Sequence, residues 1–192
     1  MTFIKGEKCE LRVLEGSDHE ISEWQSWVNR GLTTKYLFTG SIPMRKIDIE
    51  AKWEEERRAG SVEFGIWTTN LRYAPQYGGM SDKFIGTTGL YAHRDIYRLW
   101  EFRILIFHPD YIGAGIGTEA TGLVVDYGFK RLNAHRIWLG VNAENLGAIE
   151  CYKKSGFTEE GRLRKEIFYD GHYADAVRMG ILEDEWKSRS KV

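Results

Sequence analysis

The sequence is poor in cysteine, in long apolar runs and in net charge. Its two cysteines, Cys9 and Cys151, form no Cys-x-x-Cys pair and no His/Cys group at metal-ligand spacing, so we predict neither a disulfide framework nor a bound metal. No stretch approaches the roughly 18 uninterrupted apolar residues of a membrane span, and the first residues lack the apolar core of a signal peptide. The formal net charge of −1 gives no overall attraction to nucleic acid or to an anionic membrane. We therefore expect a soluble, cytoplasmic protein that recognises charged partners locally.

The composition is that of a folded protein. Hydrophobic residues make up 42 % of the 192 residues and charged residues 29 %. A domain of this length buries roughly 70 % of its unfolded surface, which is enough for a core without disulfides. Because the chain shows no repeat, no low-complexity segment and no linker, we predict one domain over residues 1–192.

Hydrophobic periodicity predicts seven strands and four helices. The strands are expected at residues 8–14, 63–69, 83–91, 99–107 and 135–141, with two more around the hairpin signal Asp170-Gly171. The helices are expected from the capping box at Ser17, over 44–60, from Ile116, and over 145–155 with a stop at Gly156. Residues 70–82 are expected to form a loop. The strand at 99–107 is apolar on both sides in its second half, which predicts cover on both faces.

Three glycines, Gly113, Gly115 and Gly117, alternate between the end of a predicted strand and the start of a predicted helix. Bare backbone at such a place is suited to phosphate, because free N–H groups and the positive end of the helix dipole converge there. A dinucleotide fingerprint would need glycine where Thr118 stands, and a P-loop would need Gly-Lys-Ser/Thr, so neither fits. A tight turn without a ligand is the alternative interpretation.

The residues downstream weaken that alternative. Asn145-x-x-Ala148, Tyr152 and Gly156-Phe157 follow on the next helix. With "EFRILIFHPDYIGAGIGTEA" (101–120) and "VNAENLGAIECYKKSGFTEEGRL" (141–163), the chain resembles the GNAT superfamily of N-acetyltransferases. It looks closest to the branch with ribosomal-protein alanine and spermidine acetyltransferases, and the hairpin "FYDGHYADAVRMGIL" is especially similar to the spermidine enzymes. The likeness runs from about residue 84 to residue 184, whereas residues 1–83 share only the order of elements.

The resemblance implies an α/β fold of the α+β type. Its mixed central sheet would have about seven strands, splayed in the middle, and about four flanking helices. It also implies acetyl-CoA as cosubstrate and no metal. The pantetheine arm would lie in the splay beside backbone groups of Leu105, Ile106 and Phe107, and the diphosphate would lie on the glycine loop. The remaining coenzyme contacts are expected from Ile112, Gly113, Ala114, Gly115, Ile116, Gly117, Thr118, Asn145, Ala148 and Tyr152.

The loop departs from the family at two positions. Ile112 stands where the family commonly has Gln or Arg, and Ala114 replaces a frequent lysine. Both changes remove a polar or basic side chain that could assist coenzyme binding. The backbone N–H groups of residues 113–118 remain, so we expect the coenzyme still to bind.

Two residues are implied as catalytic by the resemblance. Tyr152 would protonate the coenzyme thiolate, and the alternative is that it is a core tyrosine. Glu101 would relay the proton of the amine, with a pKa raised by an apolar setting between Trp100 and Phe102. Glu101 could equally be an ion-pair partner of Arg103 or Arg136. Asn145 is expected to cap its helix as well as to contact the pantetheine.

Other polar residues have ordinary explanations. His108 and His135 flank strand ends, where an exposed or capping histidine is expected, and Cys151 is expected to be a small buried hydrophobe. Five acids on the second predicted helix could bind a cation, but a solvated face is the simpler interpretation; they are Asp48, Glu50, Glu54, Glu55 and Glu56.

We therefore predict an N-acetyltransferase that moves an acetyl group directly from acetyl-CoA to a primary amine. The C-terminal hairpin favours a small amine or polyamine. A protein N-terminus, an aminosugar nucleotide, and a non-catalytic CoA-binding module encouraged by Ile112 remain alternatives. A dinucleotide-binding domain is the third class. Edge strands in the final hairpin permit a homodimer or a larger homo-oligomer.

Overall fold

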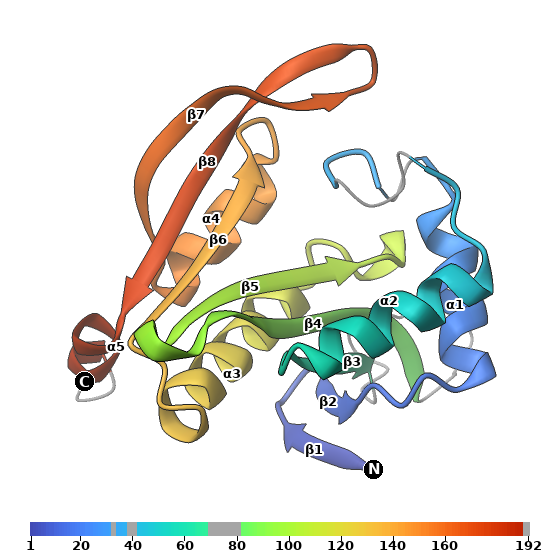
Figure 1. Ribbon diagram of the computed structural model, residues 1–192, viewed down its shortest axis with the longest axis horizontal. Coiled ribbons are helices and arrows are strands. Elements are labelled where there is room, and N and C mark those ends of the chain that lie inside the picture. Colours follow the sequence, from blue (N-terminus) through green and yellow to red (C-terminus); the bar gives the residue numbers. More distant parts are fainter. Residues whose placement is uncertain (32–33, 38–41, 69–81, 190–192) are drawn as a thin grey trace.

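The computed structural model describes residues 1–31, 34–37, 42–68 and 82–189 (Figure 1). The loop expected over residues 70–82 lies outside the described residues apart from Asp82. In the part of the chain that is described, no helix is long and apolar enough to cross a membrane.

Eight strands form one mixed sheet in the order β1-β2-β3-β4-β5-β6-β8-β7. All neighbours are antiparallel except β5 and β6, which are parallel. The strands are β1 (Thr2–Lys5), β2 (Glu10–Val13), β3 (Val62–Thr68), β4 (Lys83–Arg94), β5 (Leu99–Ile106), β6 (Arg136–Asn142), β7 (Thr158–Tyr169) and β8 (His172–Leu182).

The prediction of about seven strands missed β1. This strand has four residues, of which only Ile4 is partly buried, so it gives almost no alternating pattern. The strand expected at 8–14 is therefore the second one, β2. The other six predicted strands are present.

Four helices cover the two faces of the sheet (Figure 1). Helices α1 (Asp18–Val28) and α2 (Lys46–Arg58) pack on one face, around a core cluster with Trp24, Trp53 and Phe107. Helices α3 (Ile116–Arg131) and α4 (Leu146–Ser155) pack on the other face. The predicted capping box is confirmed, because Ser17 accepts from the Glu20 N–H and the Glu20 carboxylate accepts from the Ser17 N–H.

A fifth helix, α5 (Glu183–Arg189), was not predicted. It has seven residues and none is buried, so it shows no apolar stripe. Trp186 holds it on α3 by stacking on Phe129 and by donating from Nε1 to Asp126 Oδ1 at 2.6 Å.

The sheet opens between its two parallel strands. Strands β5 and β6 pair only at Leu99, Trp100 and Glu101, the last opposite Trp138. Beyond that point β5 stays paired with β4 up to Ile106, and β6 stays paired with β8 up to Asn142. The second half of β5 is covered on both faces as predicted, because Ile104 and Ile106 pack against the core beside α3 and α4 and Leu105 packs against the core beside α1 and α2, although all three stay only half-buried. Its apolar side chains border this opening.

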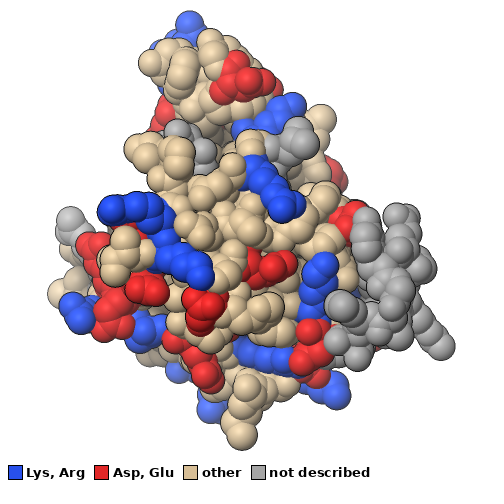
Figure 2. All heavy atoms as spheres, turned by 90° about the vertical axis from the view of Figure 1, so that its right-hand side faces the viewer, with Lys and Arg blue, Asp and Glu red and all other residues tan. Residues whose placement is uncertain are grey.

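The last two strands form a long hairpin that extends beyond the rest of the sheet (Figure 1). Asp170 and Gly171 both have positive φ, 47° and 81°, as a two-residue hairpin turn requires. On the face turned toward the viewer in Figure 2, which carries α1, acidic and basic side chains are interspersed.

Candidate active site

The glycine loop enters α3 with its backbone exposed. Gly113 and Gly115 have φ of +83° and +80°, which side chains other than glycine rarely adopt. Gly115 is the N-terminal cap of α3, so the first free N–H groups of the helix follow directly. Nothing lies within 4 Å of the position where a Cβ of Gly113 would be. The loop therefore has the open geometry at a helix start that suits an anion.

Three elements meet at Gly117. A Cβ at this glycine would lie 3.4 Å from Ile106 Cδ1 on β5 and 3.7 Å from Cys151 Sγ on α4. The hydroxyl of Thr118 donates to Cys151 Sγ at 3.4 Å, and the hydroxyl of Ser155 lies 3.4 Å from the Thr118 carbonyl. The fold thus joins the loop, the end of β5 and the tyrosine helix in one place.

The backbone of β5 faces the opening at alternate residues. The Phe107 N–H donates to the Ile85 carbonyl on β4 at 3.1 Å. Since hydrogen-bonded pairs alternate in an antiparallel ladder, Leu105 also turns its backbone groups toward β4. Past the last β5–β6 pair, Glu101 and Trp138, the backbone groups that face the opening are the carbonyl of Phe102 and the N–H and C=O groups of Ile104 and Ile106, since the Phe102 N–H still belongs to the β5–β6 ladder. Of the three residues predicted for pantetheine, Ile106 alone faces the opening with its backbone.

Tyr152 lies on α4 beside the same opening. Its ring packs edge-on against Phe102 at 6.1 Å and against Phe157 at 6.0 Å between centroids. Burial raises the pKa of its phenol, with a smaller contribution from Cys151. Among the described residues none is hydrogen-bonded to its hydroxyl. Tyr152 thus packs in the core, and its phenol stays protonated at neutral pH.

Asn145 begins this helix as predicted. Its side-chain oxygen accepts from the Ala148 N–H at 3.2 Å, and Gly156 ends the helix in the left-handed conformation at φ 105°.

Glu101 lies on the other face of the sheet. Its carboxylate pairs with Arg103 at 2.8 and 3.0 Å, and Arg103 also donates to Glu56 of α2 at 3.0 Å. The predicted apolar setting was wrong, because the side chains of its strand neighbours Trp100 and Phe102 point to the opposite face. Of the two expected ion-pair partners, Arg103 is the one found, while Arg136 pairs with Glu160.

His108, expected to be exposed or capping, occupies the N-cap position of the short 3₁₀ turn Pro109–Tyr111, but its side chain is buried and makes no capping hydrogen bond. It is 5 % exposed, between Trp27 and Tyr111, with Lys83 Nζ 2.6 Å from Nε2 and Asp110 Oδ2 3.0 Å from Nδ1. Burial, with the charge of Lys83, lowers its pKa. The position of His108 beside the end of a predicted strand did not indicate that its side chain would be buried. His135 is exposed, as expected.

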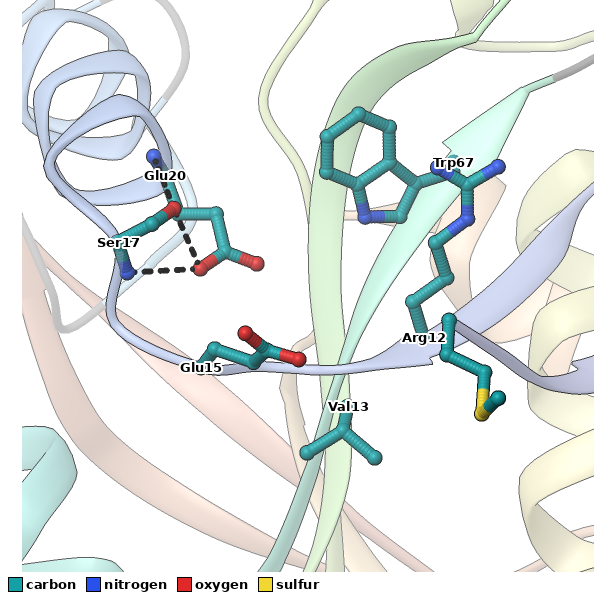
Figure 3. Close-up of a pocket in the computed structure, with 7 residues that line it drawn as sticks. Arg12, Val13, Glu15, Ser17, Glu20 and Trp67 are labelled. Carbon is teal, nitrogen blue, oxygen red and sulfur yellow. Dashed lines mark hydrogen bonds between the residues drawn. The ribbon is translucent and has the colours of Figure 1, made fainter.

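Three of the five acids predicted on α2 have ion-pair partners: Asp48, Glu54 and Glu56. Asp48 pairs with Arg45, and Glu54 pairs with Arg57 and Arg58, so the interpretation as a solvated helix face holds for these two. A hollow at the start of α1 is lined by Met1, Arg12, Val13, Glu15, Ser17, Glu20 and Trp67 (Figure 3). Arg12 covers the Trp67 ring there at 4.6 Å, and Glu20 is used by the helix cap. The Glu20 carboxylate therefore belongs to local structure.

The residues present fit coenzyme A. An open glycine loop at a helix start suits a diphosphate, and unpaired backbone on β5 offers hydrogen bonds to an extended amide-bearing arm. Residues 10–158 match the family model of the acetyltransferase (GNAT) domain. The chain belongs to the GNAT family. The family resemblance and the fold class predicted from the sequence are thus confirmed.

Relatives in this family include spermidine acetyltransferases. The spermidine N(1)-acetyltransferase of Escherichia coli K12 is 40 % identical over 106 residues, which is 55 % of this chain and 56 % of that enzyme. The chain therefore matches little more than half the length of that relative. A probable N-acetyltransferase of Bacillus subtilis is 28 % identical over 95 % of this chain and 98 % of its own length. The structure of the Vibrio cholerae spermidine N-acetyltransferase with CoA and spermine superposes with a TM-score of 0.79 at 27 % identity, covering 95 % of this chain and 99 % of that one.

Proposed function

We propose that this protein is an N-acetyltransferase that moves an acetyl group from acetyl-CoA to a primary amine in a ternary complex. The observation that carries the proposal is the convergence of the glycine loop, the unpaired edge of β5 and the Tyr152 helix in a GNAT fold. We also propose that residues 1–192 act as one domain in the cytoplasm. The single sheet and two free cysteines support this.

When bound, acetyl-CoA supplies an acetyl group activated as a thioester. The N–H groups after Gly113 hold the diphosphate, and backbone groups of Phe102, Ile104 and Ile106 align the arm along β5. The nitrogen of the neutral amine attacks the acetyl carbon, so that a C–N bond forms and the C–S bond breaks. The amine proton passes to Glu101 through water, and the Tyr152 phenol protonates the departing sulfur. A thiol has a pKa near 8.5 in water, and the apolar surroundings that raise the Tyr152 pKa also raise that of a buried thiolate.

A polyamine is the proposed acceptor. The Escherichia coli relative is named for spermidine, and the Vibrio cholerae structure contains spermine. The Vibrio cholerae enzyme also forms a dodecamer, and we propose a homo-oligomer for this chain on that likeness. A non-catalytic CoA-binding module is the second candidate, since Ile112, which is 65 % exposed beside the loop, brings no charge to it.

The test is a thiol-release assay with acetyl-CoA and a panel of amines. The panel contains spermidine, spermine, an alanine-initiated peptide and an aminosugar nucleotide. We expect release with the two polyamines and a matching mass gain of one acetyl group on the acceptor. CoA binding without release by any amine would favour the module instead.

A further inference from the structure

The N-terminal strands are tied to the first turn of α3. The carboxylate of Glu119 accepts from the backbone N–H groups of Glu7, Lys8 and Cys9 at 2.9, 2.8 and 2.9 Å. Gly6 makes room for this contact, because a Cβ there would lie 2.6 Å from Glu119 Oε2. Three convergent donors fix the β1–β2 connection against the helix that carries the glycine loop.

This attachment places one lysine at the loop. Lys8 Nζ lies 3.4 Å from the Ala114 carbonyl oxygen, and a Cβ on Gly115 would be only 2.6 Å from Nζ. The ammonium is therefore in contact with the loop backbone, although Lys8 is about a hundred residues away in the chain. Its side chain is half-buried, so the flexible stem is partly constrained.

The loop has no cationic side chain of its own at the two positions where the family commonly has a polar or basic one. Its own side chains at 112 and 114, Ile and Ala, carry no charge, and Glu119 places a negative charge in the first turn of the helix. A diphosphate at this helix start would be repelled by Glu119 in the absence of a compensating charge. The three backbone donors offset part of that charge, and the Lys8 ammonium provides the opposite charge at the loop itself.

We propose that Lys8 binds the diphosphate of the coenzyme and so replaces a basic side chain within the loop. The inference rests on the proposed function, because the diphosphate is that of acetyl-CoA. A turn of the side chain from the Ala114 carbonyl to a phosphate oxygen exchanges a neutral acceptor for a charged one, which makes a stronger hydrogen bond. Glu119 acts as a positioning residue for this lysine.

The experiment measures the affinity for CoA by isothermal titration. It compares the unaltered protein with Lys8→Met, Lys8→Arg and the control Lys5→Met, which removes an exposed lysine of the same hairpin. We expect Lys8→Met to bind CoA about tenfold or more weakly, with Lys8→Arg and Lys5→Met within about threefold of the unaltered protein. Thermal unfolding without ligand serves to show that the variants fold.

Two further ligands identify the group that Lys8 contacts. With 3′-dephospho-CoA the loss caused by Lys8→Met should be as large as with CoA, because the diphosphate is still present. With acetyl-pantetheine, which lacks the diphosphate, Lys8→Met should change the affinity by less than about twofold. A Lys8→Met protein that binds CoA as the unaltered protein does, or that loses acetyl-pantetheine equally, would overturn the role of Lys8 and leave the acetyltransferase proposal standing. An unaltered protein that fails to bind CoA would overturn both.

Discussion

Glu101 and Tyr152 lie on opposite faces of the central sheet, one on each side of the opening between β5 and β6. Tyr152 packs against Phe102 on the α4 side, and Glu101 is paired with Arg103, which contacts Glu56 on the α2 side. In the proposed mechanism the phenol on one face protonates the departing sulfur, and the carboxylate on the other face accepts the proton of the amine.

Replacing Tyr152 by Phe tests the acid. The change removes one hydroxyl and leaves the ring contacts with Phe102 and Phe157, so the fold and the affinity for CoA should be nearly unchanged. We expect kcat to fall about a hundredfold. Because burial raises the Tyr152 pKa, the phenol is protonated throughout the neutral range, and the loss should be the same at about pH 6.5 and pH 8.5. Equal turnover of the two proteins would leave Tyr152 as a core residue only.

Glu101→Gln and Glu56→Gln distinguish a base from an ion-pair partner. Both carboxylates contact Arg103, so each variant loses one ion pair with this arginine. We expect Glu101→Gln to lower kcat at least about tenfold at an unchanged affinity for CoA, and Glu56→Gln to keep most of the activity. Steady-state kinetics at saturating acetyl-CoA provide the comparison. Matching losses in the two variants would assign Glu101 to the ion-pair network alone.

His108 should make the stability of the protein depend on pH. Its pKa is lowered in the folded state by burial and by Lys83, whereas the unfolded chain takes up the proton near pH 6.5. The unfolded state therefore binds more protons below that pH, and the free energy of unfolding should fall as pH drops from about 7 to about 5. Urea unfolding at several pH values measures this dependence. The free energy of unfolding of His108→Gln should change less with pH, whereas that of the exposed control His135→Gln should change with pH as in the unaltered protein. A His108→Gln protein with the full pH dependence would show that other groups cause it.

Gly115→Val tests the loop. A valine at a φ of +80° is strained by about 1–2 kcal/mol or more, and its Cβ would displace Lys8 Nζ. We expect CoA binding to be lost while the folded state persists. Gly122→Ala in the same helix is the control, because nothing lies within 4 Å of its Cβ, and alanine should raise helix stability without affecting CoA. Titration with CoA measures the affinity of the two variants, and thermal unfolding shows whether they fold. Tight CoA binding by Gly115→Val would mean that the diphosphate binds elsewhere.

The sequence was sufficient for elements with a long periodic pattern. The apolar spacing from Ile116, the cap at Asn145 and the Asp170-Gly171 turn each have a local physical cause, and each predicted the element found. Strand β1 and helix α5 bury too little to leave a pattern, so their presence is decided by partners far away in the chain.

The site was predictable only in part for the same reason. The glycine loop and Tyr152 stand in recognisable local patterns, and their positions side by side follow from the fold. The burial of His108, the Arg103 pair of Glu101 and the approach of Lys8 to Ala114 depend on side chains meeting across elements. The register between β4 and β5 also decides which backbone groups of β5 face the opening. A shift of this register by one residue would turn the other set of N–H and C=O groups toward it.

Hydrogen exchange with and without CoA is the most direct test of the central claim, that main-chain amides of the loop and of β5 bind the coenzyme. The account predicts slower exchange at the amides of residues 113–118 and at those of Ile104 and Ile106, with little change at Leu105 and Phe107, whose N–H groups face β4. Saturation with CoA that left the loop amides unprotected would contradict it.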